Sequence, residues 1–318
     1  MNKRTRRTLL IVATVLVLLA VAVFLRSKAP PEAARLLPES DGIVYVDFQP
    51  LRAFAHKGWR PPQRDPEYQQ FIDAVGIDPE QDLNQAAVAL HALENPNGPN
   101  GPVAYSWVLV GKLTGKRLNA WLETHAVARE EYSGHTIYSV PSEGRTVRVA
   151  QIGYDMVAGS NYPTAEKIHS IIDRHRTAAL PFSGSTLLEH HYHDVPLLSL
   201  AWGVGKIGLP FAEKGSISVL GFQLPLEADA NIVASVRWAG TLHLRVEEFA
   251  PNEEKARRQA AALATLVTLA RGFSQPLGNT TANNTLRELV NDATVEQKHD
   301  RVVVTATLPP SFMADLAQ

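Results

Sequence analysis

The residues of this chain with the clearest capacity for chemistry form one consecutive run, His190-His191-Tyr192-His193-Asp194. Imidazole and carboxylate groups are common ligands of zinc, copper and nickel. The spacing limits how many of them can converge on one ion. If Thr186 to Glu189 form a capping box that opens a short helix, His190 and His193 share a face, whereas in a strand His191 and His193 would do so.

Two interpretations of this run are open. In the first, His190, His193 and Asp194 form part of a metal site, and the remaining ligands come from distant segments, because either local geometry brings only two imidazoles together. In the second, the run is a solvated polar turn. A solvated turn binds no ion. On this interpretation the sequence predicts no cofactor.

A glycine-rich segment from Gly203 to Gly208 matches the GxGxxG pattern of dinucleotide-binding loops. Such a loop requires a helix that begins within the glycines, so that its N–H groups meet the pyrophosphate. Pro210 and Gly215 leave no room for a helix of ordinary length. We therefore expect a glycine-rich loop between two strands.

The sequence lacks the local signatures of several enzyme classes, namely HExxH, GxSxG and a serine three residues before a lysine. The adjacent acids Glu130-Glu131 and Glu247-Glu248 lie in predicted strands, where neighbouring side chains point to opposite faces. No catalytic residue is predicted. The alternative is an envelope hydrolase or metal-dependent enzyme whose residues are dispersed around His190–Asp194.

Trp59 and Arg60 lie in a proline-stiffened loop, Gly58-Trp59-Arg60-Pro61-Pro62. Tryptophan and arginine are enriched among residues that dominate binding interfaces, so this tip is a candidate for binding a partner. Alternatively, the indole holds its own loop against the domain. The other four tryptophans fall in predicted strands or helices and are expected in the core.

A basic cluster at the N-terminus, formed by Lys3, Arg4, Arg6 and Arg7, runs directly into an apolar stretch from Leu9 to Leu25. As a helix this stretch would be about 26 Å long, slightly less than the ~30 Å hydrocarbon core of a bilayer. Snorkelling of the flanking basic side chains closes that difference. The sequence therefore predicts a transmembrane signal anchor that contacts the lipid bilayer.

A cleaved secretory signal is the alternative to an anchor, and it requires small residues at a cleavage site. The local candidate, Ser27-Lys28-Ala29, is followed by two prolines and is unfavourable for cleavage. The chain has no cysteine, which excludes a lipid anchor on a cysteine side chain.

The distribution of charge predicts the orientation of the chain. Four Lys/Arg precede the apolar stretch and two follow it, so we expect a single-pass protein of the inner membrane with a cytoplasmic N-terminus and a periplasmic or extracellular remainder. That remainder carries 25 basic and 32 acidic residues, a net charge of about −7. No nucleic-acid partner is expected, because phosphate binding normally requires a basic surface.

Strand and helix patterns predict an α+β fold with mainly antiparallel sheets and with helices on one face. Gly42–Phe48 is an apolar, β-branched run and is expected to be a strand. A long helix should follow Pro251-Asn252 and end near Arg271-Gly272. Further strands are expected over 85–93, 103–113, 129–132, 135–140, 146–152, 154–159, 216–223, 231–238, 241–248, 294–298 and 301–308, and further helices over 68–75, 115–124, from 163 and over 286–290.

The order strand, helix, hairpin recurs about three times along the chain, which suggests two α+β domains. Thr177–Ser185 is small and polar and reads as a linker between them. The expected organisation is a cytoplasmic tip and anchor over 1–28, a linker over 29–35, one domain over 36–176, a linker over 177–186 and a second domain over 187–318.

The segment Ala34–Asp47, followed by Pro50-Leu51-Arg52, resembles the start of the ectodomain in uncharacterised, signal-anchored bacterial envelope proteins, which begin "LLP…D…VYVD…LR". The terminal strand Val302–Leu308, with Pro309-Pro310 and a short helix, is similar to theirs as well. The resemblance implies a bacterial, membrane-tethered ectodomain, and it assigns no functional residues.

Together these features lead us to expect a non-catalytic, membrane-tethered module of the bacterial envelope. It would bind an envelope protein or another envelope component through its sheet faces or through the Trp59 loop. Assembly through unpaired sheet edges is a further alternative, because such edges can pair with a second chain.

Overall fold

The computed structural model describes residues 29–55, 64–113, 115–177, 184–206, 230–274 and 281–308, together with the short segments 212–213, 216–219 and 222–224. The predicted anchor at residues 1–28 and the Trp59–Arg60 tip lie outside these ranges. Within the described ranges, no helix combines the length and the apolar character needed to cross a bilayer.

Each predicted strand has a counterpart close to its expected range, except that the strand expected at 216–223 is two short strands, and the strands over 199–206 and 212–213 were not predicted. The strands are β1 Gly42–Asp47, β2 Leu83–Ala92, β3 Val103–Gly111, β4 Ala128–Tyr132, β5 His135–Ser142, β6 Arg145–Gln151, β7 Met156–Ser160, β8 Ser199–Lys206, β9 Ala212–Glu213, β10 Ser216–Val219, β11 Phe222–Leu224, β12 Asn231–Trp238, β13 Leu242–Phe249, β14 Thr294–Lys298 and β15 Arg301–Leu308.

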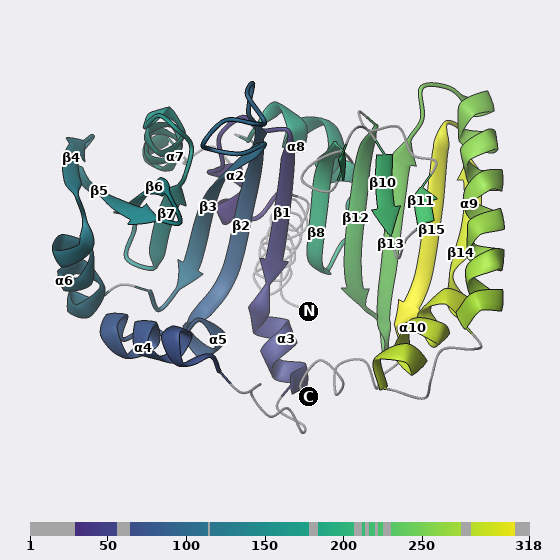
Figure 1. Cartoon of the computed structure of the whole chain (residues 1–318), viewed down its shortest axis with the longest axis horizontal. Coiled ribbons are helices and arrows are strands. Elements are labelled where there is room, and N and C mark those ends of the chain that lie inside the picture. The colour runs from purple at the N-terminus through teal and green to yellow at the C-terminus, as the bar shows by residue number, and fades with distance from the viewer. Residues whose placement is uncertain are drawn as a thin grey trace, which may run out of the picture.

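Twelve of these strands form one sheet in the order β14-β15-β13-β12-β8-β1-β2-β3-β7-β6-β5-β4 (Figure 1). All its described pairings are antiparallel. The other three strands form a small sheet in the order β11-β10-β9. The predicted α+β class with antiparallel sheets is confirmed.

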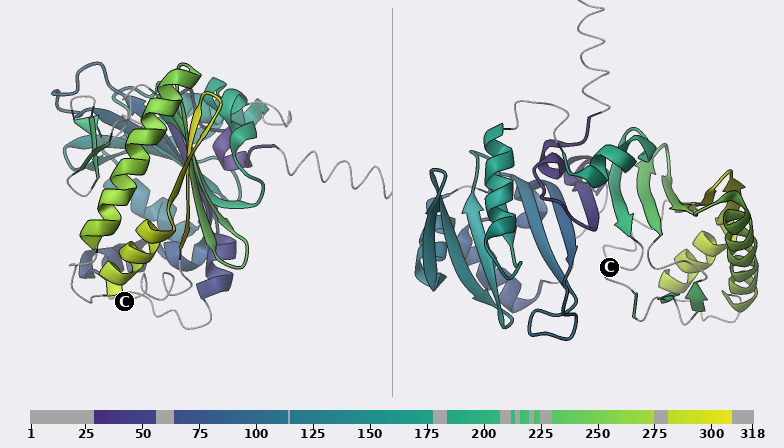
Figure 2. Two further views of the ribbon diagram at one scale, coloured as in Figure 1. Left: turned by 90° about the vertical axis from the view of Figure 1, so that its right-hand side faces the viewer. Right: turned by 90° about the horizontal axis from the view of Figure 1, so that it is seen from above.

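The helices agree with the predicted ranges to within a few residues where a helix was expected. The helices are α2 Glu32–Arg35, α3 Phe48–Ala55, α4 Pro66–Val75, α5 Pro79–Asp82, α6 Lys116–His125, α7 Glu166–Thr177, α8 Thr186–His191, the 3-10 turn η1 Tyr192–Asp194, α9 Glu253–Ser274 and α10 Thr281–Asp292. Figure 2 shows α2, α7 and α8 on one side of the large sheet and α4 and α9 on the other.

The prediction that helices would lie on one face is therefore wrong. On one face, Ile168 and Ile172 of α7 belong to the same buried cluster as Val108 of β3. On the opposite face, Leu118 of α6 belongs to a second cluster that includes Leu109, the next residue of β3. Because neighbouring residues of a strand point to opposite faces, an apolar strand such as β3 requires cover on both sides.

The two halves of the chain share this sheet through β1. On one side β1 pairs with β2, and on the other it pairs with β8, which follows the predicted inter-domain linker. Residues 178–183 of that linker lie outside the described ranges. The division into two domains stays a prediction, but the sheet itself is continuous from β1 to β8.

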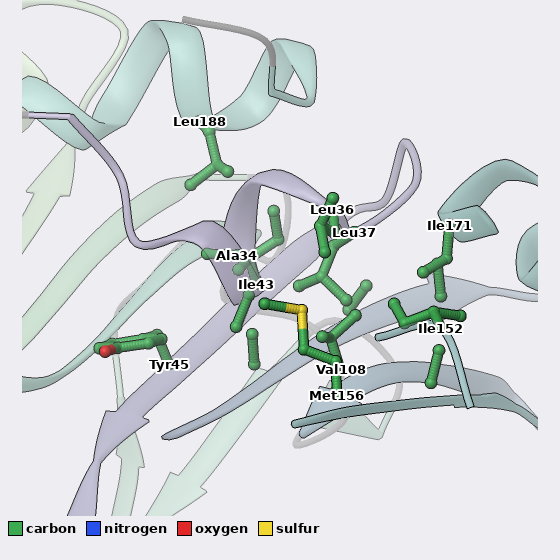
Figure 3. Close-up of a cluster of buried hydrophobic side chains, with 14 of the residues drawn as sticks. Ala34, Leu36, Leu37, Ile43, Tyr45, Val108, Ile152, Met156, Ile171 and Leu188 are labelled. Atoms are coloured by element: carbon green, nitrogen blue, oxygen red, sulfur yellow. The ribbon is translucent and has the colours of Figure 1, made fainter. Parts of the chain in front are cut away.

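The largest buried cluster lies beneath α2 and α7 on one face of the sheet (Figure 3). Small residues of the central strands, among them Ala87, Ala89 and Ala158, are fully buried. They leave room for the larger Leu36 and Leu37, which follow α2 and are also buried. Matching small residues to large ones lets the helices approach the sheet closely and fill the space between them.

Candidate pocket beside the start of the described chain

A pocket with a volume of about 470 Å³ opens where β1 and β8 meet η1. Its walls come from the first described residues, from the two central strands and from the segment that joins α8 to β8. We call it the aromatic pocket. Its lining consists of Pro31, Tyr45, Asp47, Tyr192, His193, Asp194, Val195, Pro196, Leu197, Leu198, Ser199 and Trp202.

Three aromatic rings form one wall of this pocket. Tyr45 of β1 and Trp202 of β8 are cross-strand neighbours, and their rings stack with centroids 5.4 Å apart. The rings of Tyr192 in η1 and Trp202 pack in a T-shaped arrangement, with centroids 5.3 Å apart. Offset stacking and edge contacts are the preferred geometries of aromatic pairs, so this wall is well packed.

Burial determines the protonation of the polar groups in the pocket. It raises the pKa of the Tyr45 hydroxyl far above its ordinary value, and the nearby Asp47 and Tyr192 raise it further. Burial also raises the pKa of Tyr192 and that of Asp47, where the backbone N–H of Gln49 opposes the effect. Both phenols therefore stay protonated at neutral pH and keep their capacity to donate hydrogen bonds.

The η1 wall is held in place by ion pairs in which the two carboxylates are buried. Arg301 of β15 donates from Nη1 to Asp194 Oδ1 at 2.6 Å and to Glu247 Oε2 at 3.4 Å. Arg245 Nε donates to Glu247 Oε1 at 2.7 Å. The side chains of Asp194 and Glu247 are 8% and 5% exposed. We call these four residues the ion cluster, and it ties the pocket wall to β13 and β15.

The structure brings two of the three predicted metal ligands together. His193 Nε2 lies 3.3 Å from Asp194 Oδ2, but Asp194 also pairs with Arg301. His190 Nδ1 lies 2.7 Å from the carbonyl oxygen of Thr186, one helical turn earlier. Among the described residues, no group of three or more His, Asp or Glu could hold a metal ion. The metal site stays a prediction, without a third ligand in this part of the chain.

The helix that carries these histidines begins one residue earlier than the predicted capping box. Ser185, not Thr186, is the N-cap, and its hydroxyl accepts from the N–H of Leu188 at 3.4 Å. The Ser185 side chain is fully buried, whereas Thr186 N–H donates to Glu39 at 3.0 Å. The buried hydroxyl satisfies an N–H group of the first turn that would otherwise lack a partner.

The residue types of a hydrolytic triad, Ser199, His193 and Asp194, all line the aromatic pocket. Their hydrogen bonds do not form a triad, because Ser199 Oγ donates to the carbonyl of Pro196 at 2.6 Å. The described hydrogen bonds include none between Ser199 and His193. A serine nucleophile is activated through such a bond to its base.

The glycines of the GxGxxG match that are described, Gly203 and Gly205, lie inside β8. The prediction of a loop is wrong for them. Gly205 has a φ of 144°, and a Cβ there would lie 2.5 Å from the carbonyl oxygen of Asp41. Glycine is thus needed for the close approach of β8 to the chain that enters β1.

The remaining predicted residues are accounted for as follows. Trp59 and Arg60 lie outside the described residues, so their predicted role in partner binding stays a prediction.

Glu247 and its neighbour Glu248 point to opposite faces of the sheet, as expected. Glu247 belongs to the ion cluster, whereas Glu248 Oε1 accepts from Gln259 of α9 at 3.1 Å.

Sequence reasoning missed the aromatic wall and Arg301. Trp202 was predicted to be a core residue, and its exposed fraction of 4% confirms this. Alternation along β1 places Tyr45 on the same face as Ile43, which was a usable signal. The pairing of β1 with β8, more than 150 residues later, had no local signal.

No family model and no curated protein matches this sequence. Solved structures of TP0453 in crystal forms III, I and IV are similar to it, with TM-scores of 0.47, 0.44 and 0.47 and identities of 9%, 9% and 11%. The matches cover 91%, 91% and 92% of this chain and 98%, 98% and 99% of the matched chains. Similarity at this level carries no information about function.

Proposed function

We propose that the protein is a membrane-tethered binding module of the bacterial envelope, with its α+β part on the periplasmic or outer side. The tether is the basic cluster and apolar stretch at residues 1–28, which has the charge asymmetry of an anchor with a cytoplasmic N-terminus. The binding site is the aromatic pocket. Its ligand is an envelope component or part of an envelope protein.

The observation that carries the proposal is the composition of the pocket. A wall of three aromatic rings, two protonated phenols and one partly buried carboxylate at Asp47 line one cavity. Ligand sites are typically concave and largely apolar, with a few polar groups that fix orientation. Ser199 Oγ donates to the carbonyl of Pro196, and we assign the pocket a binding role.

Filling the pocket tests the binding site. Ser199 lines the cavity, and Ser199→Phe would place a ring inside it. A photoreactive phenylalanine analogue in place of Tyr192 would report occupancy through adducts formed in cells. We expect adducts in the otherwise unchanged chain and their loss in Ser199→Phe. Ser142→Phe is the matched control, because Ser142 is exposed at the end of β5.

Adducts that persist unchanged in Ser199→Phe would contradict binding in this pocket. The tether is tested separately by fusing alkaline phosphatase, which is active only after export, to the C-terminus at Gln318. We expect an active, membrane-bound fusion. An inactive fusion would contradict the proposed orientation, and an active but soluble one would show that the N-terminal segment is removed.

A further inference from the structure

We propose that the turn formed by Leu197 and Leu198 docks onto the outer surface of the membrane in which the chain is anchored, so that the aromatic pocket opens at the bilayer interface. This inference rests on the proposed tether and names the bilayer as a second contact of the same site. Both leucines line the pocket at its rim.

The first supporting observation is the exposure of the turn. Leu197 is 49% exposed and Leu198 is 85% exposed. Two consecutive leucines directed into solvent form an apolar tip without cover among the described residues. Single exposed apolar residues are ordinary, but a leucine pair at the mouth of a cavity is the kind of surface that enters the boundary between headgroups and acyl chains.

The second observation is the backbone at Leu198, where φ is 62°. This left-handed conformation is unfavourable for a residue with a branched side chain, and glycine or asparagine would adopt it with less strain. The turn is nevertheless fixed on both sides. The N–H of Val195 donates to Tyr192 at 3.1 Å, and Ser199 Oγ bonds to Pro196, so the fold holds the leucine outward.

The third observation is the short distance along the chain between the pocket and the apolar stretch. Pro31 lines the same pocket as the leucine turn, and it is the sixth residue after Leu25, the end of the apolar stretch. Six residues span at most ~20 Å even when fully extended. If the apolar stretch ends at the outer edge of the hydrocarbon core, the pocket rim must lie close to the lipid headgroups.

Charges around the turn do not favour one sign. The His193 side chain is 68% exposed, and the exposed Arg237 is the neighbour of Ser199 across the β8–β12 pair. Asp47, which lines the same pocket, contributes an opposite charge. Docking is therefore expected to depend on apolar contact, to occur on zwitterionic lipid and to resist added salt.

The absence of cysteine from the sequence allows a direct test. In Leu198→Cys, an environment-sensitive fluorophore on the single thiol would report the surroundings of the turn. The full-length protein is reconstituted into phosphatidylcholine vesicles, with and without lipids that carry a quenching spin label near the headgroup. We expect blue-shifted emission from Leu198→Cys, loss of most of that emission on quenching, and no reversal at high salt.

Val127→Cys is the matched control, because Val127 is apolar, 70% exposed and precedes the edge strand β4. Seven strand spacings separate β4 from β8, or ~33 Å across the sheet. The control label should keep a water-like emission. Water-like emission at Leu198, or equal quenching at both positions, would overturn the proposal.

Flotation of the same samples separates the two proposals. If the protein floats with vesicles after a carbonate wash while the Leu198 label remains water-like, the tether stands and the docking fails. If the protein does not float, the tethered function fails and the docking fails with it.

Discussion

Two buried polar clusters lie at opposite ends of one row of cross-strand neighbours, and they are built on different principles. The row runs across six pairs through Ser160, Ser106, Ala89, Ile43, Val204, Val233 and Glu247. At one end, His91, Ser106 and Ser160 form a neutral chain that we call the hydroxyl cluster. At the other end lies the ion cluster around Glu247.

The side-chain hydrogen bonds of the hydroxyl cluster link three neighbouring strands, and Ser160 Oγ also accepts from the N–H of Tyr162 at 3.1 Å. His91 Nε2 lies 3.0 Å from Ser106 Oγ, which lies 3.0 Å from Ser160 Oγ. All three residues are at most 3% exposed, and they sit on the adjacent strands β2, β3 and β7. The bonds therefore join strands that the backbone already joins, and they complete the hydrogen bonding of groups that burial separates from water.

The ion cluster instead connects parts of the chain that are far apart. Asp194 and Arg301 are 107 residues apart, and their bond joins η1 to β15. Removing charges from water is costly, so such a cluster is stable only while every ion keeps its partner. The difference suggests that the hydroxyl cluster supports the sheet, whereas the ion cluster positions the wall of the aromatic pocket.

Loss of Arg301, the cation shared by Asp194 and Glu247, should lower the free energy of unfolding more than any other change in or beside the two clusters. Arg301→Ala leaves the buried Asp194 and Glu247 without it, and we expect the free energy of unfolding to fall by about 4 kcal/mol. Urea unfolding of the full-length protein in detergent would measure this. Arg257→Ala, on the exposed face of α9, is the control and should change stability by less than about 0.5 kcal/mol. If Arg301→Ala and Arg257→Ala lowered the free energy of unfolding equally, Arg301 would be no more important than a surface charge, and the proposed distinction between the ion cluster and the hydroxyl cluster would fail.

The hydroxyl cluster should make the free energy of unfolding depend on pH. Burial, followed by the charge of Lys167, lowers the pKa of His91 from 6.5 to about 4. Between these values the unfolded chain binds a proton that the folded chain does not, so stability is complete above pH 6.5 and is lost as pH falls toward 4. We expect a loss of roughly 3 kcal/mol from this residue.

His91→Gln provides the comparison, because it keeps a hydrogen-bonding group without an imidazole. Carboxylates titrate in the same range, so the quantity to measure is the difference in pH dependence between the two proteins. The unchanged protein should lose more stability on acidification than His91→Gln does. Parallel curves would show that His91 titrates normally and that the cluster is open to water.

Removal of the Ser106 hydroxyl should lower the free energy of unfolding less than removal of the Arg301 guanidinium. Ser106→Ala leaves His91 Nε2 and Ser160 Oγ without their shared partner, and we expect a loss of about 2 kcal/mol in the free energy of unfolding. Ser142→Ala, at an exposed position, is the control for urea unfolding. The aromatic pocket should be unaffected in Ser106→Ala. Loss of Tyr192 photoadducts in this variant would argue that the two clusters are coupled.

The elements of the fold could be predicted because their signals are local. Gly76 ends α4 in a left-handed conformation with φ of 70°, as its position after Val75 indicates. The buried face of α9, which includes Ala256 and Leu263, follows from helical spacing. The cover of both sheet faces could not be predicted by the same reasoning, because it depends on which strands become central.

The candidate site was predictable only in part. His193 and Asp194 stood out as chemistry-bearing residues, and both line the pocket. The cation that pairs with Asp194 is Arg301, which lies in the C-terminal hairpin, and no local sequence pattern marks it. Register between distant strands decides which side chains meet, and it is set by the whole sheet rather than by local pattern.

The smallest expected effect concerns how the ion cluster holds its cation. The guanidinium of Arg301 lies over the ring of Phe249, with Cζ 4.5 Å from the centroid. Phe249→Leu keeps an apolar side chain but removes the π face, and we expect a loss of about 1 kcal/mol in the free energy of unfolding. The same change in an Arg301→Ala background should cost less, because the cation is already gone. A double-mutant cycle with urea unfolding measures the difference. Equal costs in both backgrounds would mean that carboxylates alone hold Arg301, and the contrast with the neutral cluster would then rest entirely on charge.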